Sequence, residues 1–119
     1  MQYMLLIYDD EHEFATMRGD SREAVFQEYM ALVGDLGSKY VTGAPLAPTT
    51  AATTVRVRDA EQLVTDGPFA ETKEQLGGYF LVDVESLDEA LEIAARIPGA
   101  RFGSVEVRPV IQERREAVA

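Results

Sequence analysis

The sequence predicts a single α+β domain in which a split βαβ sheet carries both helices on one face. Segments with the alternation of strands and segments with helical spacing follow one another in the order strand, helix, strand, hairpin, strand, helix, strand. The length of 119 residues, with 46% apolar and 27% charged residues, suits one domain with one core.

The first half of the chain predicts a strand, a helix and a short second strand. Residues 3–8 are apolar on both alternating faces, which is typical of a strand that is buried on both sides. Residues 9–19 are polar and predict a loop. Helical spacing of apolar residues predicts a helix over about 21–36, and Gly37 supplies its end. A short strand is expected over 39–44.

The second half predicts a hairpin, a strand, a second helix and a last strand. The second helix begins after Ser86, which forms a capping box with Glu89, and its apolar side is expected to consist of Leu87, Ala90, Leu91, Ala94 and Ala95. The register and turn type of the hairpin are not readable from the sequence. The expected segments are 53–58 and 62–65 for the hairpin, 78–84 for the strand, 87–97 for the helix and 104–110 for the last strand.

This order of elements suits a ferredoxin-like split βαβ sheet, and two helices can cover only one side of it. Residues 3–8 are nevertheless apolar on both sides, and Tyr79 and Leu81 add apolar surface opposite Phe80 and Val82. An uncovered face of that kind would be a large exposed apolar patch. The simplest cover is the sheet of an identical subunit, so we expect a homodimer. A helix or the chain's own tail folding over the face is the alternative.

The charge and the composition argue against several classes of partner. The net charge is −10, from 11 Lys and Arg against 21 Asp and Glu, so neither direct nucleic-acid binding nor docking on an anionic membrane is expected. The chain has no cysteine, which excludes disulfides, thiol nucleophiles and cysteine-bound metals. No segment has the roughly 20 apolar residues of a membrane span, and no basic region precedes the first apolar run, so we expect a cytoplasmic protein.

The segment Val64–Tyr79 reads VTDGPFAETKEQLGGY. It closely resembles the signature of DGPF-type proteins within the YCII-related superfamily, and the flanking segments agree with that family over roughly residues 1–111. The resemblance implies a dimeric α/β-barrel made from two ferredoxin-like subunits, with a pocket between the sheet and the irregular segment. We therefore expect a YCII-related/DGPF domain over 1–111 and a polar tail over 112–119.

The resemblance also bears on function. Related YCII-type proteins include a dehydrochlorinase-like enzyme and carry a proposed His–Asp pair, whereas DGPF-type proteins tend to accompany, or be fused to, extracytoplasmic-function (ECF) sigma factors. Here Ser21–Glu28, at the start of the first helix, contains no His, and Ile97 precedes Pro98 where the relatives have Asp. Neither member of the pair is therefore carried over.

Three functions remain open at this point. The first is a small-molecule-binding or regulatory module that works with a sigma-factor partner. The second is an enzyme that acts on a small organic, perhaps anionic, substrate by acid–base chemistry. The third is a structural dimer without a ligand.

The irregular segment that follows residue 65 carries the candidate catalytic residues Asp66, Glu71 and Lys73. Asp66 could tie a turn through backbone N–H groups, or it could act as a base in a pocket. Lys73 beside carboxylates could bind an anion, or a desolvated Lys73 could act as a base or nucleophile. A solvated charge cluster is the alternative for all three.

The candidate ligand-binding residues are Tyr8, Phe69, Tyr79 and Arg108. The tyrosines could offer hydroxyl groups to a pocket, and Arg108 could clamp a carboxylate. The structural alternative for Tyr8 and Tyr79 is a core tyrosine whose hydroxyl reaches water. The alternative for Phe69 is an anchor of the loop, and the alternative for Arg108 is a surface ion pair. His12 is the only histidine and lies among acidic residues, which is too weak a pattern to predict a metal site. No phosphate-loop pattern occurs, and no cofactor is expected.

Overall fold

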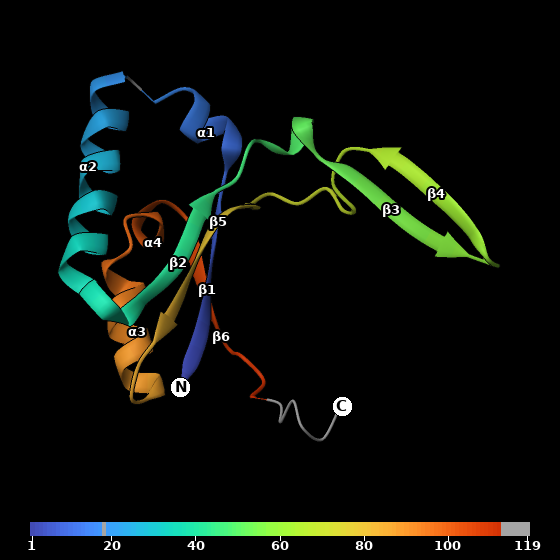
Figure 1. The fold of residues 1–119 in the computed structure, drawn as a ribbon. Coiled ribbons are helices and arrows are strands. Elements are labelled where there is room, and N and C mark those ends of the chain that lie inside the picture. The colour runs from blue at the N-terminus through green and yellow to red at the C-terminus, as the bar shows by residue number, and fades with distance from the viewer. Residues whose placement is uncertain (18, 113–119) are drawn as a thin grey trace.

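The computed structural model describes residues 1–17 and 19–112, and it has an α+β fold with two antiparallel sheets (Figure 1). The strands are β1 (Gln2–Asp9), β2 (Tyr40–Pro45), β3 (Thr53–Arg58), β4 (Glu61–Asp66), β5 (Gln75–Asp83) and β6 (Ser104–Pro109). The helices are α1 (Glu11–Ala15), α2 (Gly19–Leu36), α3 (Leu87–Arg96) and α4 (Gly99–Phe102), with 3-10 turns at Gly37–Lys39 and Thr49–Ala51.

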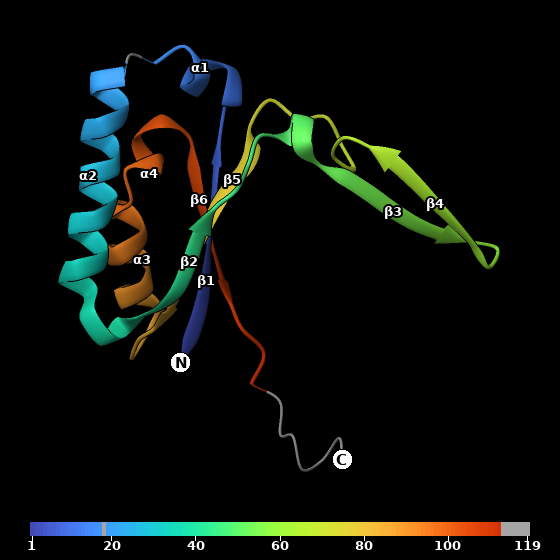
Figure 2. The same cartoon turned by 45° about the horizontal axis from the view of Figure 1, so that its top comes forward.

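The main sheet has four strands in the order β2-β5-β1-β6, and β3 pairs with β4 in a separate sheet. Strand β1 is central and pairs antiparallel with both β5 and β6, while β2 pairs antiparallel with β5. Both long helices, α2 and α3, lie on one face of this sheet (Figures 1 and 2). The predicted split βαβ topology is therefore confirmed.

The core lies between this sheet and the two helices. Tyr3, Leu5 and Ile7 alternate along β1 and are 4%, 0% and 5% exposed. They meet Phe80 and Val82 of β5 in one hydrophobic cluster. Helix α2 adds Leu32 and Leu36 to this cluster, and the second half of the chain adds Val84, Ala90, Ile93, Ala94 and Ile97.

Helix α3 packs with only part of the predicted apolar side, of which Ala90 and Ala94 are buried as predicted. Leu87, Leu91 and Ala95 are exposed, whereas Ile93 is buried between two alanines of the same helix face. The small alanine side chains allow the helix backbone to approach the sheet, so the packed face is centred on them and the two leucines turn toward solvent. The predicted cap is present, since Ser86 accepts a hydrogen bond from the backbone N–H of Glu89.

Residues 9–19 are not a simple loop, because they contain the short helix α1. Its first turn is capped by Asp10, whose Oδ1 accepts the backbone N–H groups of His12 and Glu13 at 2.9 and 3.3 Å. Strand β1 also runs one residue further than predicted, to Asp9. A second short helix, α4, follows Pro98, where only the end of a helix was expected.

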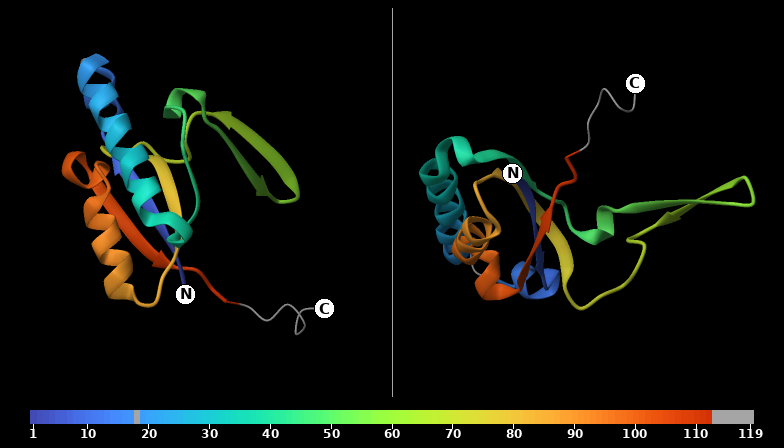
Figure 3. Two further views of the ribbon diagram at one scale, coloured as in Figure 1. Left: turned by 60° about the vertical axis from the view of Figure 1, so that its left-hand side comes forward. Right: turned by 90° about the horizontal axis from the view of Figure 1, so that it is seen from below.

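The hairpin β3–β4, residues 53–66, is named here the arm. It extends away from the domain on the side of the sheet opposite α2 and α3 (Figures 2 and 3). Its turn is formed by Asp59 and Ala60, both with positive φ, at 51° and 63°. Positive φ at both turn residues is typical of two-residue hairpin loops, because the twist of such a turn matches that of the two strands. Arg58 and Glu61, which flank the turn, pair directly with each other.

The side of the sheet away from the helices is named here the open face. It carries Met4, Leu6 and Tyr8 from β1 and Tyr79 and Leu81 from β5, all of intermediate exposure. Within residues 1–17 and 19–112, no helix or strand covers this face (Figure 3). The apolar pattern on both sides of the first strand therefore corresponds to one covered and one uncovered surface.

The predicted tail, residues 112–119, lies outside the described residues except for Gln112. None of the helices in the part of the chain that the structure describes is long and apolar enough to cross a membrane.

Candidate ligand pocket

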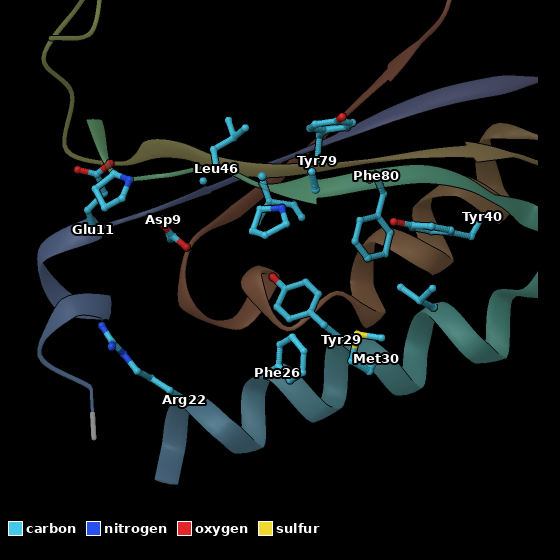
Figure 4. Close-up of a pocket in the computed structure, with 18 residues that line it drawn as sticks. Asp9, Glu11, Arg22, Phe26, Tyr29, Met30, Tyr40, Leu46, Tyr79 and Phe80 are labelled. Atoms are coloured by element: carbon cyan, nitrogen blue, oxygen red, sulfur yellow. The ribbon is translucent and has the colours of Figure 1, made fainter. Parts of the chain in front are cut away.

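A cavity of about 500 Å³ lies between helix α2 and the end of the sheet where β1 and β2 finish and β5 begins (Figure 4). This size falls within the roughly 300–1,000 Å³ that is usual for small-molecule sites. Its walls are mainly apolar, with polar groups gathered at one end. The wall residues that matter below are Asp9, Glu11, Arg22, Phe26, Tyr29, Met30, Tyr40 and Phe80.

The apolar wall comes from one face of α2 and from two aromatic side chains of the sheet. Phe26 and Met30 are 56% and 51% exposed, although they lie on the side of the helix that faces the sheet (Figure 4). Phe80 packs edge-on against Tyr40 and Tyr29, with ring centroids 5.1 and 6.2 Å apart. The cavity therefore presents large apolar side chains that the protein itself does not bury.

Asp9 is the carboxylate that enters the cavity. It follows Tyr3, Leu5 and Ile7 in the alternation of β1, so its side chain falls on the helix-covered face (Figure 4). The β1–β5 register shifts beside it, and Gly77 leaves room, because a Cβ there would lie 3.2 Å from Asp9 Oδ1. Among the described residues, no hydrogen bond or ion pair to the Asp9 carboxylate is found.

The surroundings of Asp9 favour its protonated form. Desolvation by burial is the largest cause that raises the pKa of Asp9, followed by the negative charges of Glu11, Glu74 and Asp10. A carboxyl group that holds its proton to a higher pH than usual is a candidate for donating or accepting a proton on a bound ligand.

Tyr29 supplies a hydroxyl group at the same cavity. Its oxygen accepts the backbone N–H of Gly99 at 3.2 Å, and burial is the largest cause that raises its pKa. In the described part of the chain no acceptor is found for the Tyr29 O–H, so this proton can be offered to a ligand.

Glu11 holds the mouth of the cavity together. Its carboxylate accepts the backbone N–H and the hydroxyl of Thr49 at 2.6 and 2.7 Å, and its own backbone N–H donates to Gln75 at 3.1 Å. These contacts tie α1 to the 3-10 turn at Thr49–Ala51 and to the start of β5. Arg22 reaches from α2 toward this acidic end (Figure 4).

The predicted catalytic residues lie elsewhere. Asp66 ends β4, and Glu71 and Lys73 follow in the irregular segment; all three are exposed and none lines the cavity. Their assignment stays a prediction about the base of the arm. No group of three or more His, Cys, Asp or Glu side chains that could hold a metal ion occurs among residues 1–17 and 19–112.

Three of the four predicted ligand-binding residues share the open face. Tyr8 donates its hydroxyl to Glu106 at 3.3 Å, and Arg108 lies two residues further along β6. Tyr79 contributes to the cavity rim, but its ring points to the opposite side of the sheet from that of Phe80 (Figure 4). The fourth, Phe69, is apart from them and 78% exposed.

The sequence interpretation missed Asp9 because it ended the first strand at Tyr8. Continuing the alternation by one residue places Asp9 on the same side as Ile7, which was the available signal. For Phe26 and Tyr29 the helical spacing predicted only a buried face. No pattern in the sequence indicated that part of that face would border an empty volume.

The family model of the YCII-related domain matches residues 1–114. The chain belongs to the YCII-related domain family. This YCII-related chain is 43% identical over 118 residues to an uncharacterised protein of Rhizobium meliloti (strain 1021), with 92% of each chain covered.

Among solved structures, similarity is found to the 5-chloro-2-hydroxyhydroquinone dehydrochlorinase TftG from Burkholderia phenoliruptrix AC1100, in complex with 2,5-dihydroxybenzoquinone. The alignment covers 95% of this YCII-related chain and 96% of TftG, with 18% identity and a TM-score of 0.49. The fold assignment therefore rests on the strand order and pairing described above.

Proposed function

We propose that this YCII-related protein binds a small, mainly apolar organic molecule in the cavity beside α2. Asp9 shares a proton with a hydroxyl or carbonyl group of that molecule. The observation that carries the proposal is one half-buried carboxyl group with a raised pKa at the end of a cavity of about 500 Å³ with mainly apolar walls. Ligand sites typically combine apolar walls with a few placed polar groups of this kind.

An enzyme is the second candidate, and the pairing of Asp9 with Tyr29 favours it. A carboxyl group with a raised pKa near a tyrosine hydroxyl can move a proton on a bound substrate. The prediction that placed acid–base chemistry at Asp66, Glu71 and Lys73 locates it outside this cavity. The two locations can be tested separately by substitution.

The predicted partners belong to the same proposal. An uncovered apolar sheet face supports a homodimer with a second copy of the chain, in the dimeric α/β-barrel arrangement. Glu106 and Arg108 lie on that face and carry opposite charges. Glu106 of one subunit could therefore form an ion pair with Arg108 of the other across a two-fold axis. The DGPF subtype and a sigma-factor partner remain what the segment Val64–Tyr79 predicts.

The test is a titration of methionine methyl groups by NMR, with phenol as a neutral probe and benzoate as an anionic probe of similar size. Met30 lines the cavity, and Met4 on the open face is its matched control. We expect phenol to shift the Met30 methyl signal saturably and to leave that of Met4 unchanged. Benzoate should bind more weakly, because Asp9 and Glu11 make the polar end acidic. A shift at Met4 without one at Met30 would refute the proposed site.

A further inference from the structure

The arm has one apolar face that no other part of residues 1–17 and 19–112 covers. The register places Val55 opposite Val64, with Val57 further along the same side, and these valines are 56%, 58% and 61% exposed. Their alternating neighbours on the other side, such as Thr54 and Thr65, are mainly polar. All residues of β4 are exposed.

An isolated two-stranded hairpin of this kind is at best marginally stable in water. The radius of gyration of the chain is 16.7 Å, whereas a compact domain of this length has about 13–14 Å. The extension is due to the arm, which leaves the body without packing against it (Figures 1 and 3). The hairpin would therefore gain stability from a packing surface that the described part of the subunit does not supply.

Hydrogen bonds between the segments that enter and leave the arm close its base. The Gly67 N–H donates to the Ala52 carbonyl at 2.7 Å, and the Thr54 hydroxyl donates to the Gly67 carbonyl at 2.8 Å. Arg56 donates to the Phe69 carbonyl at 3.1 Å. The arm that these bonds close at its base extends on the side of the main sheet that carries the open face (Figure 2).

We propose that the arm is a clasp that packs its valine face on a second copy of this chain, so that each subunit of the dimer holds the other. The inference rests on the homodimer proposed above and adds an element to it. A second copy fits because a two-fold axis pairs open face with open face and brings both arms onto the partner at once, which closes the assembly. Each chain carries a net charge of −10, so apolar burial by sheet and arm must outweigh their repulsion.

The experiment compares Val64→Asp with Thr65→Asp, which introduce the same charge on opposite faces of neighbouring positions in β4. The dimer dissociation constant is measured by sedimentation velocity, and circular dichroism checks the fold. We expect Val64→Asp to raise the dissociation constant about 10-fold or more and Thr65→Asp to change it less than about 3-fold. Equal effects of both variants, or none, would overturn the clasp.

A shortened arm provides a second variant, in which Asn-Gly joins Thr54 directly to Thr65, a paired position of the hairpin. We expect it to remain folded and to dimerise at least about 10-fold more weakly. Dimerisation as tight as that of the unmodified chain would overturn the clasp and leave the open-face dimer in place. A monomeric unmodified chain would overturn both, while binding of phenol at Met30 tests the cavity independently.

Discussion

The two faces of the main sheet have similarly apolar sequences but differ in how far their side chains are buried. On the helix-covered face Tyr3, Leu5 and Ile7 are buried and lead to Asp9 at the cavity. On the open face their neighbours Met4 and Leu6 are apolar as well but are only half-buried. The same strand thus serves an internal core on one side and, we propose, an interface between subunits on the other.

This difference shows that an apolar pattern predicts that a surface will be buried but does not predict which element, or which subunit, will bury it. Helices α2 and α3 bury one side of the sheet, and the cavity lies where α2 does not pack closely against the end of the sheet. The predictions below test whether the two faces differ in energy as they do in position.

The largest effect is expected from adjacent leucines of β1. Leu5→Ala removes a side chain that is 0% exposed and should lower the free energy of unfolding by about 2–5 kcal/mol, because a cavity remains in the core. Leu6→Ala should cost the monomer less than about 1.5 kcal/mol, since Leu6 is not packed under the helices. Urea denaturation at low protein concentration measures both values, and equal losses would contradict the distinction between the faces.

The open face is next in expected magnitude. Leu81→Asp places a charge where we expect the sheet of a second copy, and it should raise the dimer dissociation constant about 100-fold. The monomer should keep its fold, since Leu81 points away from the helices. Light scattering over a range of concentrations provides the measurement, and an unchanged dimer would show that the subunits associate elsewhere.

Asp9→Asn should stabilise the protein at neutral pH. The folded pKa of Asp9 is raised, so the cost of its charge is absent below the unfolded pKa of about 3.9 and grows as pH rises through the folded pKa. The gain should vanish at acid pH, where Asp9 is protonated in both the folded and the unfolded chain. Asp10→Asn keeps the helix cap and removes only one of the charges that raise the pKa of Asp9, so its gain should be smaller. Thermal unfolding at several pH values measures the effect, and a lower melting temperature of Asp9→Asn at neutral pH would contradict the prediction.

The smallest effect is expected in the arm turn. Ala60 has φ of 63°, which costs a residue with a Cβ about 1 kcal/mol relative to glycine, so Ala60→Gly should favour the hairpin. Because the arm does not pack against the body formed by the described residues, the change should appear as slower hydrogen exchange in the arm and not as a higher melting temperature. A shift of global stability of the same size would indicate that the arm is coupled to the body.

Much of the fold was predictable because the spacing of apolar residues along the chain reflects which side chains are buried. The alternation in residues 3–8 and the helical spacing over 21–36 both follow from which side chains leave water. The packed face of α3 was predicted only in part, since Leu87 and Leu91 of the predicted side are exposed and apolarity alone does not separate leucine from alanine. The close approach of helix and sheet depends instead on the small size of Ala90 and Ala94.

The candidate site was much less predictable. The residues chosen from the sequence lie in the segment with the most distinctive motif, Asp66–Lys73, yet a motif does not reveal where a volume remains unfilled. The cavity depends on how far α2 stands from the end of β1, which is a property of tertiary packing. Only the position of Asp9 could have been obtained, by extending the strand by one residue.

The most direct test of the account is the titration of the Asp9 carboxyl group, followed by carbon NMR with and without phenol. We predict a pKa above the value of about 3.9 for an unperturbed aspartate, and a further change when phenol occupies the cavity. A carboxyl group that titrates at or below that value and does not respond to phenol would contradict the proposed role of this cavity.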